Sequence, residues 1–130
     1  MAKIAMTAKG VGYLYIALTI AFTVYGQLVL KWQIAGVGQL PAGSADKIVF
    51  LLRLLFNPWV FSGFVAAFLA SLAWMAAMTK FDISHAYPFM SLNFVLVILA
   101  GGLLFHEAIT PYKLAGLALV VAGLIVGSRG

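Results

Sequence analysis

The sequence predicts an all-α membrane protein with four transmembrane helices in a small multidrug resistance-like arrangement, from three observations. Hydrophobic residues make up 65% of the 130-residue chain and charged residues only 8%, too few to cover a water-soluble globule. The gaps between charges hold about 20 residues, enough for a helix to cross a hydrocarbon core of about 30 Å. No alternating strand pattern occurs, and backbone groups in hydrocarbon must pair within their own segment, so these runs are expected to be helices. We expect one domain, residues 1–130.

The first expected span covers residues 11–31, because Val11 to Leu30 is uncharged and Lys31 closes it. Lys3 and Lys9 precede this run as in a signal peptide, but no small-residue cleavage site follows. We therefore expect the span to be retained.

The second span, residues 58–79, opens with Asn57-Pro58-Trp59, an N-cap followed by a first-turn proline and an interfacial aromatic. The third, residues 84–105, has Pro88 in or near its first turn, where the missing N–H costs at most one hydrogen bond. Thr110-Pro111 repeats the cap-then-proline pattern and begins the fourth, residues 111–127.

Between the first two spans, Gly36 to Ser44 is expected to be a turn-rich loop. Ile48 to Phe56 is apolar around Arg53 and too short to cross the membrane. It is either an interfacial helix in the membrane plane or an extension of the second span broken at Asn57-Pro58, and the interfacial helix is favoured.

Several function classes are unsupported. The absence of cysteine excludes disulfides, zinc knuckles and iron–sulfur clusters. Although the net charge is +5, the basic residues are scattered, so no nucleic-acid-binding patch forms. His85 and His106 lie at opposite ends of one span, and we expect no metal and no cofactor. Neither a nucleophile–base pair nor a phosphate-cradling glycine loop is visible, so the chain is not expected to be an enzyme.

The basic residues do not choose an orientation in the membrane. Four lie on each expected side: Lys3, Lys9, Lys80 and Arg129 on one, and Lys31, Lys47, Arg53 and Lys113 on the other. Without a bias the chain is permitted to insert both ways.

A polar ridge follows the first span, with Thr19, Thr23, Gln27 and Lys31 at successive i+4 positions. One interpretation is a groove wall for a polar headgroup, with Lys31 attracting an anion and Gly26 allowing close backbone approach. In the other, the threonines bond to their own helix, Gln27 joins two helices and Lys31 extends toward water.

On the third span, Tyr87 and Ser91 share a face and Asn93 points elsewhere; Tyr87 is equally typical of an interfacial aromatic belt. His85 is expected to be a solvated flank and Asp82 a loop charge or cap. The sole glutamate, Glu107, either pairs with Lys31 or Lys113 or receives a proton or a substrate amine.

The fourth span carries a mostly small face, formed by Gly116, Val120, Gly123 and Gly127. Small faces let membrane helices pack closely. Because four helices are few for enclosing a substrate path, a dimer through this face is expected; packing within one subunit is the alternative.

The stretch from Asn57 to Ser128 resembles the small EamA-like members of the drug/metabolite transporter superfamily, most specifically in Ala86-Tyr87-Pro88, in Ser91-Leu92-Asn93 and in the glutamate before the last span. The run GQLVLK at Gly26 to Lys31 fits the same pattern. Among these proteins the chain resembles the small subunits of the bacterial flippase for 4-amino-4-deoxy-L-arabinose-phosphoundecaprenol.

The resemblance implies a dimer, either an antiparallel homodimer or a heterodimer with a related subunit. It implies a multi-pass subunit that moves a polyprenyl-phosphate-linked sugar between leaflets of the bacterial inner membrane. The candidate substrate-binding residues are Thr23, Gln27, Lys31, Arg53, Tyr87, Ser91, Asn93 and Glu107. Lys31 and Arg53 are the candidates for phosphate contact and Glu107 for the sugar.

The more distant small multidrug resistance exporters carry a membrane-embedded glutamate in the first helix, and this chain has Thr23 at that position. Threonine does not titrate, which speaks against the exporter mechanism. The alternatives left open are a proton-coupled exporter of small hydrophobic cations or metabolites, with Glu107 as its carboxylate, and an accessory subunit without transport activity.

Overall fold

The computed structural model describes the backbone of residues 2–129 and the side chains of residues 10–129, so the side chains of Lys3 and Lys9 lie outside the described residues. The described backbone forms helices joined by turns and contains no strand, which confirms the all-α prediction. In chain order the elements are α1 (Ala2–Val37), α2 (Ser44–Leu55), α3 (Pro58–Met78), α4 (Ile83–Ala86), the 3-10 helix η1 (Tyr87–Ser91), α5 (Leu92–Leu104) and α6 (Pro111–Gly127).

Three helical segments in the described part of the chain are long and apolar enough to cross a membrane: Gly10–Val37, Pro58–Met78 and Ile83–Leu104. The fourth predicted span is the apolar helix α6, which with 17 residues is shorter than these. The first segment continues past Lys31 and through Gly36 to Val37, and it ends before Gly38, whose φ is +98°. The turn expected from Gly36 therefore begins two residues later.

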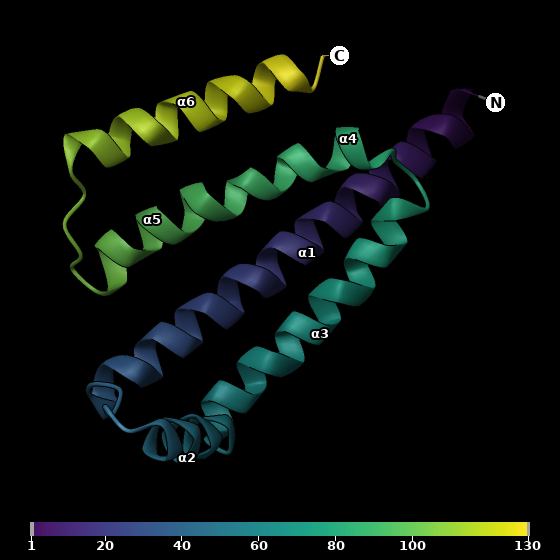
Figure 1. The fold of residues 1–130 in the computed structure, drawn as a ribbon. Coiled ribbons are helices and arrows are strands. Elements are labelled where there is room, and N and C mark those ends of the chain that lie inside the picture. Colours follow the sequence, from purple (N-terminus) through teal and green to yellow (C-terminus); the bar gives the residue numbers. More distant parts are fainter. Residues whose placement is uncertain (1, 130) are drawn as a thin grey trace.

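α1 and α3 run antiparallel, side by side, and make the most extensive helix contact in the chain (Figure 1). Glycines bring the two backbones together. A Cβ atom at Gly26 would lie 3.1 Å from the carbonyl oxygen of Gly63, and one at Gly63 would lie 3.4 Å from that of Gly26. The close approach expected at Gly26 is confirmed, and its partner is α3.

The start of α3 has the predicted cap. Asn57 Oδ1 accepts hydrogen bonds from the backbone N–H groups of Trp59 (2.9 Å) and Val60 (3.4 Å). Its Nδ2 donates to Gln33 Oε1 at 3.1 Å, so the same side chain holds the start of α3 against the end of α1. Thr110 caps α6 in the same way, accepting from the N–H of Lys113 at 3.2 Å.

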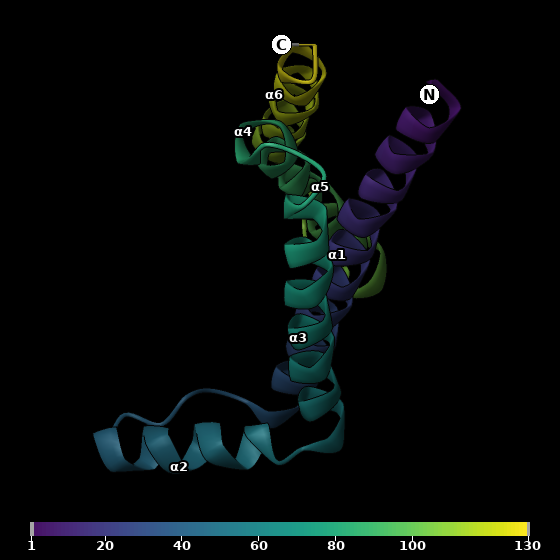
Figure 2. The same ribbon diagram turned by 90° about the vertical axis from the view of Figure 1, so that its right-hand side faces the viewer.

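α2 is a separate helix that projects crosswise from the α1–α3 pair (Figure 2). It begins at Ser44, four residues before the predicted segment, and ends at Leu55, after which the chain turns at Phe56 and Asn57. The chain changes direction there, so α2 does not continue α3 as one straight helix. Leu54 is the buried residue of α2, Phe50 is half-buried, and the other apolar side chains of α2 are exposed.

The third span is not the continuous α-helix predicted over residues 84–105. It consists of one α-turn, α4, then η1, then α5. Pro88 lies in the first turn of η1, where its missing N–H removes an i→i−4 hydrogen bond and its ring favours a tighter local winding. Asp82 is the N-cap residue of α4, and its side chain makes no capping hydrogen bond.

The buried core lies between the first half of α1 and the α3–α4 connection, where Ile16, Ile20, Ala77 and Ala86 pack together. α6 lies outside this core (Figure 1) and contacts mainly α5 and η1. α1, α3 and the η1–α5 segment therefore form the frame in which a site between helices lies.

Candidate functional site

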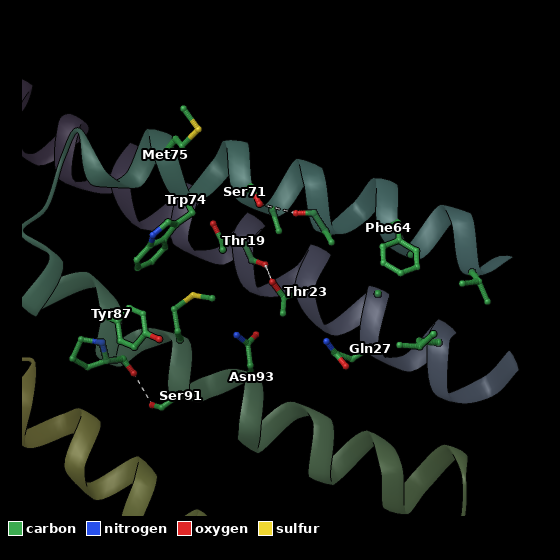
Figure 3. Close-up of a pocket in the computed structure, with 18 residues that line it drawn as sticks. Thr19, Thr23, Gln27, Phe64, Ser71, Trp74, Met75, Tyr87, Ser91 and Asn93 are labelled. Carbon is green, nitrogen blue, oxygen red and sulfur yellow. Dashed lines mark hydrogen bonds between the residues drawn. The ribbon is translucent and has the colours of Figure 1, made fainter. Parts of the chain in front are cut away.

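A cavity of about 810 Å³ lies between α1, α3 and the η1–α5 segment (Figure 3). Its lining contains no charged side chain. The polar side chains that line it come from all three walls: Thr19, Thr23, Gln27, Ser71, Tyr87, Ser91 and Asn93. We refer to this cavity as the polar groove. It offers hydrogen bonds from neutral groups within a largely apolar frame.

The α1 wall of the polar groove is the i+4 ridge identified in the sequence. Thr19 donates to the carbonyl of Tyr15 (2.8 Å) and Thr23 donates to that of Thr19 (2.7 Å). The interpretation that the threonines bond to their own helix is thus confirmed. Both nevertheless line the groove together with Gln27, which is exposed, and their hydroxyl oxygens retain acceptor capacity.

The η1–α5 wall brings together Tyr87, Ser91 and Asn93. The expectation that Asn93 points elsewhere is wrong. That expectation assumed a continuous α-helix with 3.6 residues per turn. A 3-10 helix has three residues per turn, so each residue of η1 turns the chain by about 20° more than in an α-helix. The added rotation brings Asn93 toward the groove. Ser91 Oγ donates to the carbonyl of Pro88 at 2.6 Å.

Asn93 has an unusual environment. Its Oδ1 is buried and has no hydrogen-bond partner among the described residues. An unpaired buried acceptor costs about 1–3 kcal/mol. The Asn93 amide, which lines the groove, therefore keeps hydrogen-bonding capacity that the described residues do not use.

The α3 wall was not identified from the sequence. Ser71 and Trp74 line the groove from this side, and the Trp74 ring packs edge-on against Tyr87, with ring centroids 6.0 Å apart. Ser71 is a hydroxyl residue within an apolar run, one turn from Trp74. This pattern in the sequence could have identified the α3 wall.

One end of the polar groove, near Gln27 and Leu30, is next to an ion pair. Lys31 Nζ lies 3.9 Å from Glu107 Oε1, and the two side chains are 56% and 46% exposed. The predicted pairing of Glu107 is confirmed with Lys31 as its partner. Lys113 instead donates to the carbonyl of Ala108 at 3.0 Å.

Glu107 reaches this position through a tight turn after α5. His106 adopts a φ of 55°, and the N–H of Glu107 donates to the carbonyl of Gly101 at 3.2 Å. A Cβ at Gly101 would lie 2.9 Å from Glu107 Oε2, so this glycine leaves room for the carboxylate. A half-exposed ion pair of this kind contributes about 0–1 kcal/mol, and a competing ion can exchange with either partner.

The remaining candidates lie apart from the groove. Arg53 is exposed in the last turn of α2 and Lys31 borders the groove without lining it. On α6, added Cβ atoms at Gly116, Gly123 and Gly127 would meet nothing within 4 Å, and Val120 is half-buried. The alternative in which these glycines pack against their own chain is therefore wrong.

His85 is not the solvated flank expected from the sequence. It is half-buried in an aromatic cluster with Tyr13, Phe81 and Phe89, and the Tyr13 hydroxyl lies 3.0 Å from its Nε2. Within the described residues, no three His, Asp or Glu side chains gather in a way that would hold a metal ion.

Comparison with known proteins finds relatives that are named as flippase subunits. It is 39% identical over 73 residues, 56% of this chain and 64% of the relative, to the protein named "Probable 4-amino-4-deoxy-L-arabinose-phosphoundecaprenol flippase subunit ArnE" of Pseudomonas aeruginosa strain UCBPP-PA14. It is 33% identical over 120 residues to the ArnF subunit of Erwinia tasmaniensis, covering 88% of this chain and 92% of the relative. To the ArnE subunit of Aeromonas salmonicida it is 30% identical over 115 residues, covering 88% and 95%.

No solved structure matches the chain. Its match to the Pseudomonas aeruginosa relatives spans just under two thirds of their length. The apolar helices and these relatives together show a multi-pass membrane protein. Residues 4–129 match the EamA-like transporter family, and the chain belongs to that family.

Proposed function

We propose that this chain is a subunit of a flippase that moves a polyprenyl-phosphate-linked sugar, or a similar amphiphilic lipid, between the leaflets of the bacterial inner membrane. The polar groove carries the proposal, because it places polar but uncharged side chains in a largely apolar lining between helices long enough to span a bilayer. Family membership and the names of the relatives support the substrate class.

The groove suits the difficulty of moving a polar head through hydrocarbon. Burying one charged side chain at the bilayer centre costs about 2.5–3.5 kcal/mol on insertion scales. Hydroxyl and amide groups along the groove replace water around the sugar and phosphate, while the polyprenyl tail remains in the bilayer. Neutral groups hold the head without trapping it, and no covalent step is needed.

Lys31 and Glu107 act at one mouth of the groove. Their pair spans the gap between α1 and the α5–α6 turn and is half-exposed. A phosphate competes with Glu107 for Lys31, and the released carboxylate is then able to accept a hydrogen bond from a sugar amine. Arg53, exposed on α2, contributes a second phosphate contact from a helix that lies in the membrane interface with its apolar side chains in the lipid.

In this proposal, residues 1–130 form one domain with four spans. α6 rises about 26 Å over its 17 residues and crosses the membrane with its glycine face against a second subunit. That partner is an identical chain or a related one. The even division of basic residues between the two sides permits an antiparallel pair.

The test is translocation by the purified full-length chain in proteoliposomes containing undecaprenyl-phosphate-linked amino sugar, followed by the accessibility of the sugar amine to a membrane-impermeant reagent. Gln27→Leu removes an amide from the groove and is expected to slow translocation about tenfold, a barrier change of about 1.4 kcal/mol. Gln39→Leu makes the same change in the exposed 38–43 loop and is expected to retain the wild-type rate. Translocation no faster than in protein-free vesicles, both for the chain alone and for the chain combined with a related subunit, would refute the proposal.

A further inference from the structure

A second pocket lies at the opposite end of the α1–α3 pair from Lys31 and Glu107. Its volume is about 560 Å³. Apart from Met78 and Phe81, its lining is polar or carries a polar tip: Tyr13, Thr79, Lys80, Asp82, Ser84 and His85. None of these residues lines the polar groove, and we refer to this second site as the end pocket.

The end pocket is held against α1 by specific contacts. The Tyr13 hydroxyl lies 3.0 Å from His85 Nε2, and the Tyr13 and Phe81 ring centroids are 4.8 Å apart. Gly12 allows this approach, since a Cβ there would lie 2.7 Å from the Phe81 ring and 3.0 Å from Lys80 Cβ. The α3–α4 connection is thereby anchored to α1.

The end pocket contains both signs of charge, unlike the polar groove. Lys80 and Asp82 line it together, and they form no ion pair with other side chains of residues 10–129. Lys31 and Glu107 provide the same two charges at the other end. Tyr13 and Lys31 are 18 positions apart in α1, roughly 27 Å at about 1.5 Å per residue, which is close to the thickness of a bilayer core.

We propose that the end pocket is a second headgroup site, which binds a zwitterionic phosphate–amine head at the leaflet opposite Lys31 and Glu107. Lys80 contacts the phosphate, and Asp82 contacts the protonated amine, which the faces of Tyr13 and Phe81 also favour. The inference rests on the proposed flippase function. It gives the uncharged groove, at each end, a binding site whose charges complement those of the lipid head.

The absence of cysteine from the chain permits a direct binding test. Ser84→Cys introduces a thiol in the end pocket, and Ser128→Cys introduces one at the C-terminal end of α6, on the same side of the molecule (Figure 1). The full-length variants in nanodiscs are labelled with a water-soluble maleimide. At a lipid concentration about ten times Kd, undecaprenyl-phosphate-linked amino sugar is expected to slow labelling of Ser84→Cys about tenfold and to leave Ser128→Cys unchanged. Thr79→Cys, also in the pocket, is the second reporter.

Two further variants test the roles of Lys80 and Asp82 separately. In the reporter background, Lys80→Gln is expected to weaken protection by both the amino-sugar lipid and its N-acetylated form about tenfold. Asp82→Asn is expected to weaken protection by the free amine only, so that the two lipids become equivalent. Arg129→Gln removes a positive charge at the same end, outside the pocket, and is expected to change neither.

The outcomes distinguish this inference from the proposed function. Translocation without protection of either reporter overturns the end pocket and leaves the flippase proposal standing. Protection without translocation supports the end pocket as a binding site and overturns the flippase proposal. Equal protection by both lipids in the parent reporter overturns the role of Asp82, and protection that survives Lys80→Gln overturns the role of Lys80.

Discussion

Glycine has opposite environments in two regions of this protein. At the α1–α3 crossing, Gly26 and Gly63 face each other's backbone so closely that an added Cβ would meet a carbonyl oxygen. On α6, Gly116, Gly123 and Gly127 meet nothing within 4 Å. The crossing uses one glycine from each helix and α6 carries three, but among the described residues only the crossing glycines have a close partner.

The difference distinguishes glycines that allow packing within the subunit from glycines on a surface that is free to contact another helix. The crossing positions the α1 and α3 walls of the polar groove, so its glycines stabilise the subunit. The α6 glycines have open space where a side chain would lie and leave a surface on which another helix can pack closely. The same substitution in the two regions should therefore have different consequences.

The largest effect is expected for Gly63→Leu. Its side chain would overlap the backbone of α1 at Gly26, and overpacking of this kind costs about 3 kcal/mol. We expect a large loss of folded protein, measured by chemical denaturation in detergent and followed by circular dichroism. Gly123→Leu is the matched control and should unfold like the wild type at protein concentrations at which the subunit is monomeric; equal losses would show that the two regions do not differ.

The next largest effect concerns association. If the α6 face is the dimer interface, Gly116→Leu and Gly123→Leu should weaken self-association about tenfold, about 1.4 kcal/mol, because the helices can no longer approach closely. Energy transfer between labelled subunits in detergent micelles measures this. If energy transfer is unchanged in both variants, the α6 face contacts lipid rather than a second subunit.

A third prediction separates function from stability at Asn93. Asn93→Leu removes a buried acceptor that has no partner among the described residues, so the free energy of unfolding should stay the same or rise by up to about 1 kcal/mol. Translocation should fall about tenfold, because the groove loses a polar amide from its lining. A clear loss of stability would instead show that Asn93 is paired within the folded subunit.

The smallest effect is expected at the Lys31–Glu107 pair. Both side chains are about half exposed and 3.9 Å apart, so Glu107→Gln should change the free energy of unfolding by less than about 1 kcal/mol. A double-mutant cycle with Lys31→Gln measures the coupling, which should decrease further at high salt. Coupling above about 2 kcal/mol would contradict a pair that a phosphate can open.

Local features of the sequence were enough to place most helices. The caps at Asn57 and Thr110 act within three residues of their own position, and each is followed by a proline at the first helical position. The apolar runs between charges likewise gave α3 and α6 to within a residue. The all-helical fold follows because an unpaired backbone group in hydrocarbon is costly whatever its tertiary surroundings.

The predictions from sequence that were wrong concern features that depend on small differences in local backbone energy or on residues far away along the chain. Pro88 permits either a continuous helix or a 3-10 segment, and this choice, which sequence periodicity does not resolve, turns Asn93 into the groove. His85 is half-buried because Tyr13, 72 residues away, binds it. The separation of α2 from α3 depends on how the turn at Phe56 and Asn57 directs the chain.

The sequence by itself determined that the chain is helical and apolar and where Thr23, Gln27 and Glu107 lie along it, since composition, caps and i+4 spacing are local properties. Only the tertiary structure decided that Glu107 pairs with Lys31 rather than Lys113, that Ser71 and Trp74 complete the groove, and that the α6 glycines face away from their own chain. These outcomes depend on distances between segments far apart in sequence, which helix packing sets and no local spacing encodes.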